Sequence, residues 1–291
     1  MFRIIAGLII LVVIAGCGKD QAQTTIGKDK SPLICHVGGT MRPLMVKLAK
    51  LYEAKTGQKI SINSAGSGEL LAHIELMQVG DIYVCHDPFL DLLMKKKLGV
   101  DGWVIAELFP VIIVQKGNPK KITGLKDFTR DDIEIFLTDY KHSSLGRMLP
   151  TIFSKAGINF KQLVKQKNIH TNKSGSYVGN MIKLKNADAA IVWKVVAELR
   201  ANAVEQISID NYLPAPFVDM VTGATGKAYK LTPMRVTIAT LKCSTQPTAA
   251  AKFAQFLTSA TATKALTVAG YKVNAASPGA VYKNGVACDD H

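Results

Sequence analysis

The segment at residues 33–40, with the sequence LICHVGGT, constrains the fold more than any other part of the chain. An apolar run of strand length ends in two glycines and a threonine. Apolar residues then recur at helical spacing over residues 41–52. Gly38 and Gly39 leave room for a bend or a bound molecule, and Thr40 is expected to cap the helix. The segment therefore predicts a strand, a tight turn and a helix.

The start of such a helix is chemically suited to hold an anion. Its first N–H groups have no partner within the helix, and the helix dipole adds partial positive charge there. The same order of strand, turn and helix returns at residues 59–77 and again at residues 81–93, where Asp87 and Pro88 are expected to begin the helix. Three alternating units predict a parallel sheet whose loops gather at one edge.

A second group of elements follows the apolar residues 108–114. A strand at residues 133–137 leads through a polar turn, residues 138–146, to another helix. The polar segment 171–176 precedes a further helix, and residues 189–193 form an apolar strand. Each of these helix starts carries small or hydroxylated residues, which are plain helix caps or, taken together, donors around one cleft.

The chain then returns to the first group through a strand at residues 235–240. This order predicts an α/β protein of two lobes, each a mostly parallel sheet flanked by helices, with a ligand cleft between the lobes. Two ranges, 31–110 and 238–291, are assigned to lobe I, and residues 111–237 to lobe II. The lobes are expected to hinge at the crossing strands, near Pro110 and Arg235.

The first seventeen residues have a different character. Arg3 precedes an apolar run at residues 4–14 that is too short to span a bilayer, which is typical of an export signal. The sequence IAGC that ends at Cys17 resembles a bacterial lipoprotein box, so residues 1–17 are predicted to be a signal peptide that ends at lipidated Cys17. Residues 18–30 then form a tether to the membrane. An ordinary signal peptide with an incidental cysteine is the alternative.

Composition narrows the choice of partner. The net charge is +14, but the lysines are not interleaved with aromatic residues, so nucleic acid is not an expected partner. Two explanations of the positive charge stay open. It attracts anionic solutes or an anionic membrane surface, or it belongs to a solvated lysine surface without further function. With 291 residues, 48% of them hydrophobic, the chain is long enough for two lobes with a core.

The cysteines give no Cys-x-x-Cys motif, which excludes zinc-ribbon and thioredoxin-like sites. In an exported protein, Cys243 and Cys288 are expected to form a disulfide that ties down the C-terminal tail. Cys35 and Cys85 are expected to be buried strand residues.

Two repeated pairs, Cys35-His36 and Cys85-His86, leave three possibilities open. Both histidines are expected at the cleft, where they pack, contact an anion or bind a transition metal together with Cys85. A histidine base in an enzyme on the same fold is a further alternative, but no partnered nucleophile is evident. Ser67 lacks the first glycine of the Gly-x-Ser-x-Gly motif, so a hydrolase site is not predicted.

From residue 33 to about residue 272 the chain resembles the periplasmic molybdate-binding proteins of ABC transporters, a branch of the type II solute-binding proteins. The resemblance rests on four short motifs, which are GT at 39–40, AGSGEL at 65–70, GDIY at 80–83 and ADAAIVW at 187–193. It implies a two-lobed periplasmic binding protein of type II. It also implies a monomer without enzymatic activity, cofactor or resident metal, which works with an ABC permease.

The resemblance also implies which residues hold the ligand. In that family a tetrahedral oxyanion is bound by two hydroxyls of the first lobe, by backbone N–H groups of the second lobe and by a tyrosine hydroxyl. Trp193 stands at the tyrosine position and brings one donor and more bulk, so Ser176 and Tyr177 are the alternatives for the fifth contact. The residues expected at the site are Gly39, Thr40, Ser67, His86, Leu145, Gly175, Ser176 and Trp193.

The ligand class follows from the donors. An oxyanion leaves water only if it gains a full set of hydrogen bonds, and uncharged N–H and O–H donors supply them. Without a carboxylate in the pocket, a fully ionised dianion is favoured over phosphate, whose proton needs an acceptor. Asp87 and Asp139 are the residues that could reverse this preference. We therefore expect the protein to bind molybdate or tungstate, with sulfate next. Together with the lipoprotein box, this predicts an envelope lipoprotein anchored on the periplasmic or extracellular side of a bacterial membrane.

Overall fold

The computed structural model describes residues 31–215, 219–222, 228–230, 234–273 and 279–288. The expected signal peptide, lipidated cysteine and tether lie outside the described residues. Among the described residues, no helix has both the length and the apolar character needed to cross a membrane.

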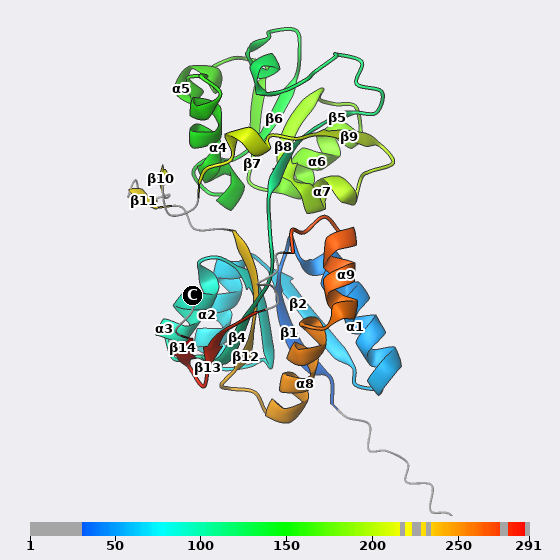
Figure 1. Ribbon diagram of the computed structural model, residues 1–291, viewed down its shortest axis with the longest axis vertical. Helices are drawn as coiled ribbons and strands as arrows, with labels where there is room; N and C mark the ends of the chain where they lie inside the picture. The colour runs from blue at the N-terminus through cyan, green and yellow to red at the C-terminus, as the bar shows by residue number, and fades with distance from the viewer. Residues whose placement is uncertain (1–30, 216–218, 223–227, 231–233, 274–278, 289–291) are drawn as a thin grey trace, which may run out of the picture. The chain divides into compact units, whose positions relative to one another are not determined.

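Lobe I is built on a seven-stranded sheet with the strand order β14-β13-β4-β12-β3-β1-β2 (Figure 1). Its strands are β1 (Leu33–Gly38), β2 (Ile60–Ala65), β3 (Ile82–His86), β4 (Gly99–Glu107), β12 (Arg235–Leu241), β13 (Gly279–Lys283) and β14 (Val286–Ala287). Its helices are α1 (Arg42–Thr56), α2 (Ser67–Met77), α3 (Phe89–Lys95), α8 (Pro247–Leu257) and α9 (Ala260–Val268). In Figure 1, α1, α8 and α9 lie on one side of this sheet and α2 and α3 on the other.

Lobe II is built on a five-stranded sheet with the order β7-β6-β8-β5-β9. Its strands are β5 (Pro110–Gln115), β6 (Ile135–Thr138), β7 (Ile169–Asn172), β8 (Ala189–Trp193) and β9 (Val204–Ile207). Its helices are α4 (Ser144–Lys155), α5 (Phe160–Leu163), α6 (Gly175–Lys183) and α7 (Lys194–Glu198). Two short 3-10 helices, Leu125–Thr129 and Asp210–Tyr212, and the antiparallel pair β10 (Met220–Thr222) and β11 (Ala228–Lys230) complete the described elements.

The predicted α/β fold with two helix-flanked sheets is confirmed, but both sheets are mixed. Strand β1 pairs in parallel with β2 and β3, and β6 pairs in parallel with β7 and β8, as the alternating units predict. The strands next to the crossings, β4, β5 and β12, pair antiparallel with their neighbours. The expectation of mostly parallel sheets is therefore right only for the strands that lead into the predicted turns.

The helices bury the faces that their apolar spacing predicts. In α1 the buried residues are Leu44, Met45, Leu48, Ala49 and Tyr52. The strand cysteines Cys35 and Cys85 are buried as expected, with 1% and 0% exposure. Parallel pairing places Gly38 beside Ala65, so the turns after β1 and β2 start at the same edge of the sheet.

Two predicted helix caps are wrong. Helix α1 begins one residue later than expected, at Arg42 after Met41, and no side chain caps it. Thr40 therefore keeps its hydroxyl for other contacts. Helix α3 begins at Phe89, and the carboxylate of Asp87 instead accepts hydrogen bonds from Arg235, at 2.8 Å from Nε and 2.9 Å from Nη2.

The predicted disulfide between Cys243 and Cys288 is also wrong, because both residues are free thiols. The Cys243 thiol is directed to the carbonyl of Gly80, with Sγ 3.6 Å from the oxygen. Cys288 follows β14, where its own N–H donates to the carbonyl of Val281 at 3.0 Å. The C-terminal strands are thus held by backbone pairing, of β13 with β4 and of β14 with β13, instead of by a covalent bond.

Candidate functional site

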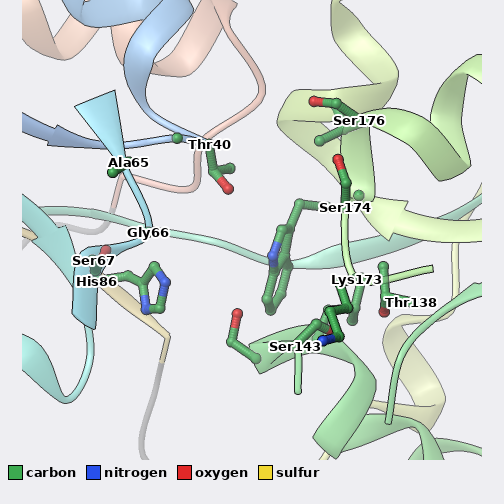
Figure 2. A pocket seen from close by; sticks show the side chains of 16 residues that line it. Thr40, Ala65, Gly66, Ser67, His86, Thr138, Ser143, Lys173, Ser174 and Ser176 are labelled. Atoms are coloured by element: carbon green, nitrogen blue, oxygen red, sulfur yellow. The ribbon is translucent and has the colours of Figure 1, made fainter. Parts of the chain in front are cut away.

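A cavity of about 400 Å³ is lined by residues of both lobes (Figure 2). It lies at the carboxyl ends of the parallel strands, where each strand turns into the next helix. All eight residues expected at a ligand site line it, and the described residues of its lining are Gly39, Thr40, Ala65, Gly66, Ser67, His86, Thr138, Ser143, Ser144, Leu145, Lys173, Ser174, Gly175, Ser176, Trp193 and Val196. Figure 2 shows Thr40, Ser67 and His86 on one side and Thr138, Lys173 and Ser176 facing them.

Ser67 is the first residue of α2 and contributes a buried hydroxyl. The residue is 5% exposed, and its Oγ has no hydrogen-bond partner in the described part of the chain. The turn that carries it is fixed because the Tyr83 hydroxyl donates to the carbonyl of Ser67 at 2.6 Å. A Cβ atom at Gly38 would lie 2.6 Å from this Oγ, so the first glycine of the initial turn makes room for the hydroxyl.

Thr40 holds the corresponding place after β1. The turn is tied to its neighbour by Gly39, whose N–H donates to the carbonyl of Ala65 at 3.0 Å. The Thr40 hydroxyl makes no hydrogen bond to any described residue, and the side chain is half-buried beside the cavity. The two hydroxyls predicted from lobe I are thus both unengaged and both line one cavity.

The start of α4 supplies backbone donors from lobe II. The Ser143 hydroxyl caps the helix by accepting from the N–H of Gly146 at 2.8 Å, and it donates to the carbonyl of Asp139 at 2.9 Å. The cap leaves the N–H groups of Ser144 and Leu145 without a partner among the described residues. These two groups begin the helix at the cavity wall.

Helix α6 repeats this arrangement. The Ser174 hydroxyl accepts from the N–H of Tyr177 at 3.2 Å, which leaves the N–H groups of Gly175 and Ser176 without described partners. Ser176 also brings a hydroxyl to the lining, whereas Tyr177 does not line the cavity and packs against Phe136. Of the two alternatives for a fifth contact, only Ser176 is in position.

Eight of the sixteen lining residues were not predicted as site residues, and Thr138 and Lys173 are two of them. Thr138 is the last residue of β6, is 2% exposed, and has a buried Oγ1 that no described residue bonds. The sequence feature that could have identified Thr138 is a hydroxyl at the carboxyl end of a parallel strand. In lobe I, Thr40 and Ser67 come shortly after the ends of such strands. Lys173 precedes α6 and adds a positive charge to a lining that the prediction treated as uncharged.

The carboxylates that could disfavour a dianion are engaged elsewhere, and no carboxylate is among the described residues that line the cavity. Asp87 binds Arg235 through the ion pair described above. Asp139 accepts from the N–H groups of Lys141 and His142, each at 2.8 Å. Burial opposes its ionisation, yet these hydrogen bonds hold the pKa of Asp139 below its ordinary value.

His86 ends β3 and lines the cavity with its imidazole ring. Its Nδ1 lies 2.8 Å from the carbonyl oxygen of Asp87, and its ring meets Phe89 edge-on. Burial lowers the pKa of His86 below its ordinary value of 6.5, partly opposed by the hydrogen bond to Asp87. The ring is therefore neutral in the free protein near neutral pH.

The expectation that His36 also reaches the cleft is wrong. This ring is 1% exposed, with Nε2 2.8 Å from the carbonyl of Val79 and Nδ1 3.2 Å from Nδ2 of Asn63. Both ring nitrogens are thus used inside lobe I, and burial lowers the pKa of His36. Cys85 is engaged with the hydroxyl of Thr237, at 3.2 Å.

These contacts overturn the metal site proposed for His36, His86 and Cys85. In the described part of the chain, no three His, Cys, Asp or Glu side chains are grouped so as to hold a metal ion. Trp193, at the end of β8, is 5% exposed and lines the cavity with its indole ring. Its Nε1 donates to no described residue and is free to meet a ligand.

Solved structures of similar fold support this reading of the architecture. The chain superposes with a TM-score of 0.65 on the substrate-binding domain of a molybdenum ABC transporter from Clostridium difficile, at 20% identity, covering 84% of this chain and 99% of that one. The Azotobacter vinelandii periplasmic molybdate-binding protein gives 0.65, at 14% identity and 83% and 99% coverage. The sulfate-binding protein of Mycobacterium tuberculosis gives 0.62, at 19% identity and 85% and 88% coverage. At these identities the likeness shows the fold alone.

Sequence comparisons show the family. A binding protein from Haemophilus influenzae is 25% identical over 148 residues, an alignment that covers 49% of this chain and 60% of that protein. The profile of the family described as "Bacterial extracellular solute-binding protein" matches residues 34–272, which include every residue of the cavity lining. The chain therefore belongs to the bacterial extracellular solute-binding proteins, with the type II periplasmic fold.

Proposed function

We propose that the protein captures a tetrahedral oxyanion outside the cytoplasm and presents it to an ABC importer. Molybdate or tungstate is the first choice of ligand and sulfate the next. One observation carries the proposal: the Ser67 and Thr138 hydroxyls come from opposite lobes, line one cavity, and are both buried without a hydrogen-bond partner among the described residues. A buried polar group without a partner costs about 1–3 kcal/mol, which a bound oxyanion would recover.

The remaining donors fit the same guest. At the starts of α4 and α6, the four residues whose N–H groups have no partner among the described residues all line the cavity, and helix starts favour negative charge. Lys173 adds a positive charge, and the lining lacks a carboxylate. This donor set suits a small, doubly negative tetrahedral ion, and the ligands named for two of the fold neighbours, molybdate and sulfate, are of that class.

The proposal includes closure of the two lobes on the ligand. The proposed lobes are residues 31–110 with 238–291 and residues 111–237. These boundaries fall inside β5 and β12, near the starts of the two strands where the chain crosses from one sheet to the other. Motion at these crossings would bring the donors of both lobes to one ion. The closed protein acts as a monomer on its permease, held at the membrane by a lipid on Cys17.

A thermal-shift panel tests the ligand class. Molybdate, tungstate, sulfate, phosphate and divalent metal ions are compared, because a ligand that binds only the folded protein raises its melting temperature. Isothermal titration with molybdate and sulfate then ranks the oxyanions. A melting rise with metal ions alone would favour a metal-binding protein. Turnover of a substrate would favour an enzyme on this fold, although the family consists of binding proteins.

A further inference from the structure

The hydrogen bond of His86 fixes which ring nitrogen carries its proton. Nδ1 lies 2.8 Å from the backbone carbonyl oxygen of Asp87, and a carbonyl can only accept. The neutral ring therefore holds its proton on Nδ1. Nε2 has no partner among the described residues, and it is the nitrogen left for the cavity that the ring lines.

Without a proton, Nε2 is a hydrogen-bond acceptor and cannot form a hydrogen bond with a fully ionised ligand. Oxygens of molybdate, tungstate or sulfate carry no proton at neutral pH, so both atoms of the contact would be acceptors. A hydrogen bond forms only when one proton lies between Nε2 and the ligand oxygen. That proton comes either from solution, which makes His86 a cation with two donors, or from a ligand that keeps a proton of its own, such as hydrogen phosphate.

The groups around the ring favour the neutral form before the ligand arrives. Burial lowers the pKa of His86, and the field of Arg147 on α4 acts in the same direction. Asp87 opposes this effect, but Arg235 holds that carboxylate in an ion pair. Lys173 lines the same cavity and also disfavours a second positive charge. An incoming dianion reverses this balance by adding negative charge beside the ring.

We propose that His86 makes oxyanion binding proton-dependent: a fully ionised oxyanion binds together with one proton taken up at Nε2, whereas an oxyanion that keeps its own proton binds to neutral His86. This inference rests on the proposed oxyanion function and names the residue that sets its dependence on pH. It predicts that dianions are bound more tightly in acid than in alkaline solution. It also predicts that hydrogen phosphate gains relative to sulfate as the pH rises.

Isothermal titration of the purified protein with molybdate and sulfate tests the proposal. Titrations at the same pH in buffers of different ionisation enthalpy give the number of protons taken up. At about pH 8 we expect about one proton for each bound dianion, and the Kd should rise about tenfold for each pH unit above neutrality. Phosphate at the same pH carries its own proton and should bind with little uptake.

Two variants assign the proton. His86→Gln should reduce the uptake to near zero and make the Kd for molybdate independent of pH, because a glutamine amide donates or accepts without titrating. His170→Gln is the matched control, since His170 pairs with Glu134 at 2.8 Å and does not line the cavity. It should keep the proton uptake of the unmodified protein.

The outcomes separate this inference from the proposed function. If molybdate or sulfate binds without proton uptake and with a constant Kd, or if His86→Gln keeps the uptake, the role of His86 is wrong and oxyanion binding stands. The unmodified protein alone decides the first of these, even if the variant does not fold. If no oxyanion binds at any pH, the proposed function itself fails.

Discussion

Two buried hydroxyls give the sharpest prediction at the scale of single residues. Ser67→Ala and Thr138→Val each remove a buried oxygen that has no hydrogen-bond partner among the residues that the structure describes. Each change should weaken oxyanion binding by about 1–3 kcal/mol, because the ligand loses one donor. The free energy of unfolding of the unliganded protein should stay the same or rise, because an unpaired polar group leaves the interior. Titration calorimetry and denaturant unfolding measure the two quantities.

Thr237→Val is the matched control for this pair. Thr237 is fully buried too, but its hydroxyl contacts Sγ of Cys85 at 3.2 Å and donates to the carbonyl of Cys85 at 3.3 Å. The variant should lose stability by about 1 kcal/mol and keep its oxyanion affinity. If the cavity variants behave like this control, the two hydroxyls are structural and not part of a binding site.

For single residues, the sequence predicted which residues line the cavity better than it predicted the roles of their side chains. The eight expected residues were predicted from helix starts, from strand ends and from the family resemblance, and all of them line the cavity. The two histidines look equivalent in the sequence, but β1 and β3 pair with His36 opposite Tyr83, three residues before His86. His36 therefore sits inside the sheet while His86 ends its strand. Pairing register is a property of the folded sheet, and single-strand patterns do not contain it.

At the scale of elements, the start of α4 depends on Gly146. A Cβ atom there would overlap the backbone oxygen of Asp139 and lie 2.6 Å from Oγ of Ser143. Gly146→Ala should therefore displace the helix start, reducing the unfolding free energy by about 1–3 kcal/mol and also weakening oxyanion binding. Circular dichroism melting and calorimetry check both effects. Gly124→Ala, where an added Cβ meets nothing within 4 Å, should change neither, and equal effects in both variants would contradict the account.

The ion pair of Asp87 and Arg235 joins the end of β3 to the start of β12. Asp87 is 3% exposed, and the guanidinium donates to both of its carboxylate oxygens. Arg235→Met leaves this carboxylate buried and unpaired, so the unfolding free energy should fall by about 3 kcal/mol.

Asp87→Asn combined with Arg235→Met should be more stable than Arg235→Met alone, because no charge is left unpaired. Urea unfolding of the three proteins gives the comparison. A double variant less stable than Arg235→Met would show that the pair does not act as this geometry indicates.

The sequence predicted the helices and strands, but it did not predict how the helices begin or which distant segments contact each other. The period of apolar residues located the helices and strands around the cavity, including α1 with its five buried positions. The cap at Asp87 failed because its carboxylate meets Arg235, 148 residues away in the sequence. The disulfide failed for a similar reason, since the position of Cys243 depends on β12 and that of Cys288 on β14. Contacts between segments distant in the sequence leave no local pattern.

At the scale of the whole molecule, ligand binding should close the two lobes. Small-angle X-ray scattering should show a smaller radius of gyration with molybdate than without it, because donors from both lobes must reach one ion. The Ser67→Ala and Thr138→Val double variant should show little change at the same molybdate concentration. An unchanged radius with the site saturated would mean that the lobes do not move on binding.

The two-sheet architecture could be expected from the alternation of strands and helices, and the structure confirms it. The mixed strand directions could not, because β4, β5 and β12 look like any other apolar strand in the sequence. The cavity depends on this topology, since it brings the ends of three strands from each sheet to one place. Single motifs therefore predicted what kind of residues the site contains, and the strand topology brings these residues to one cavity.

The central claim is that Ser67 and Thr138 bind the same ion. Tungstate scatters anomalously, so a crystal structure with tungstate locates the metal atom independently of the protein. We expect one anomalous peak in the cavity, with oxyanion oxygens at about 2.5–3.0 Å from both hydroxyls. A peak that contacts only one of them, or a tungstate bound elsewhere on the protein, would contradict the account.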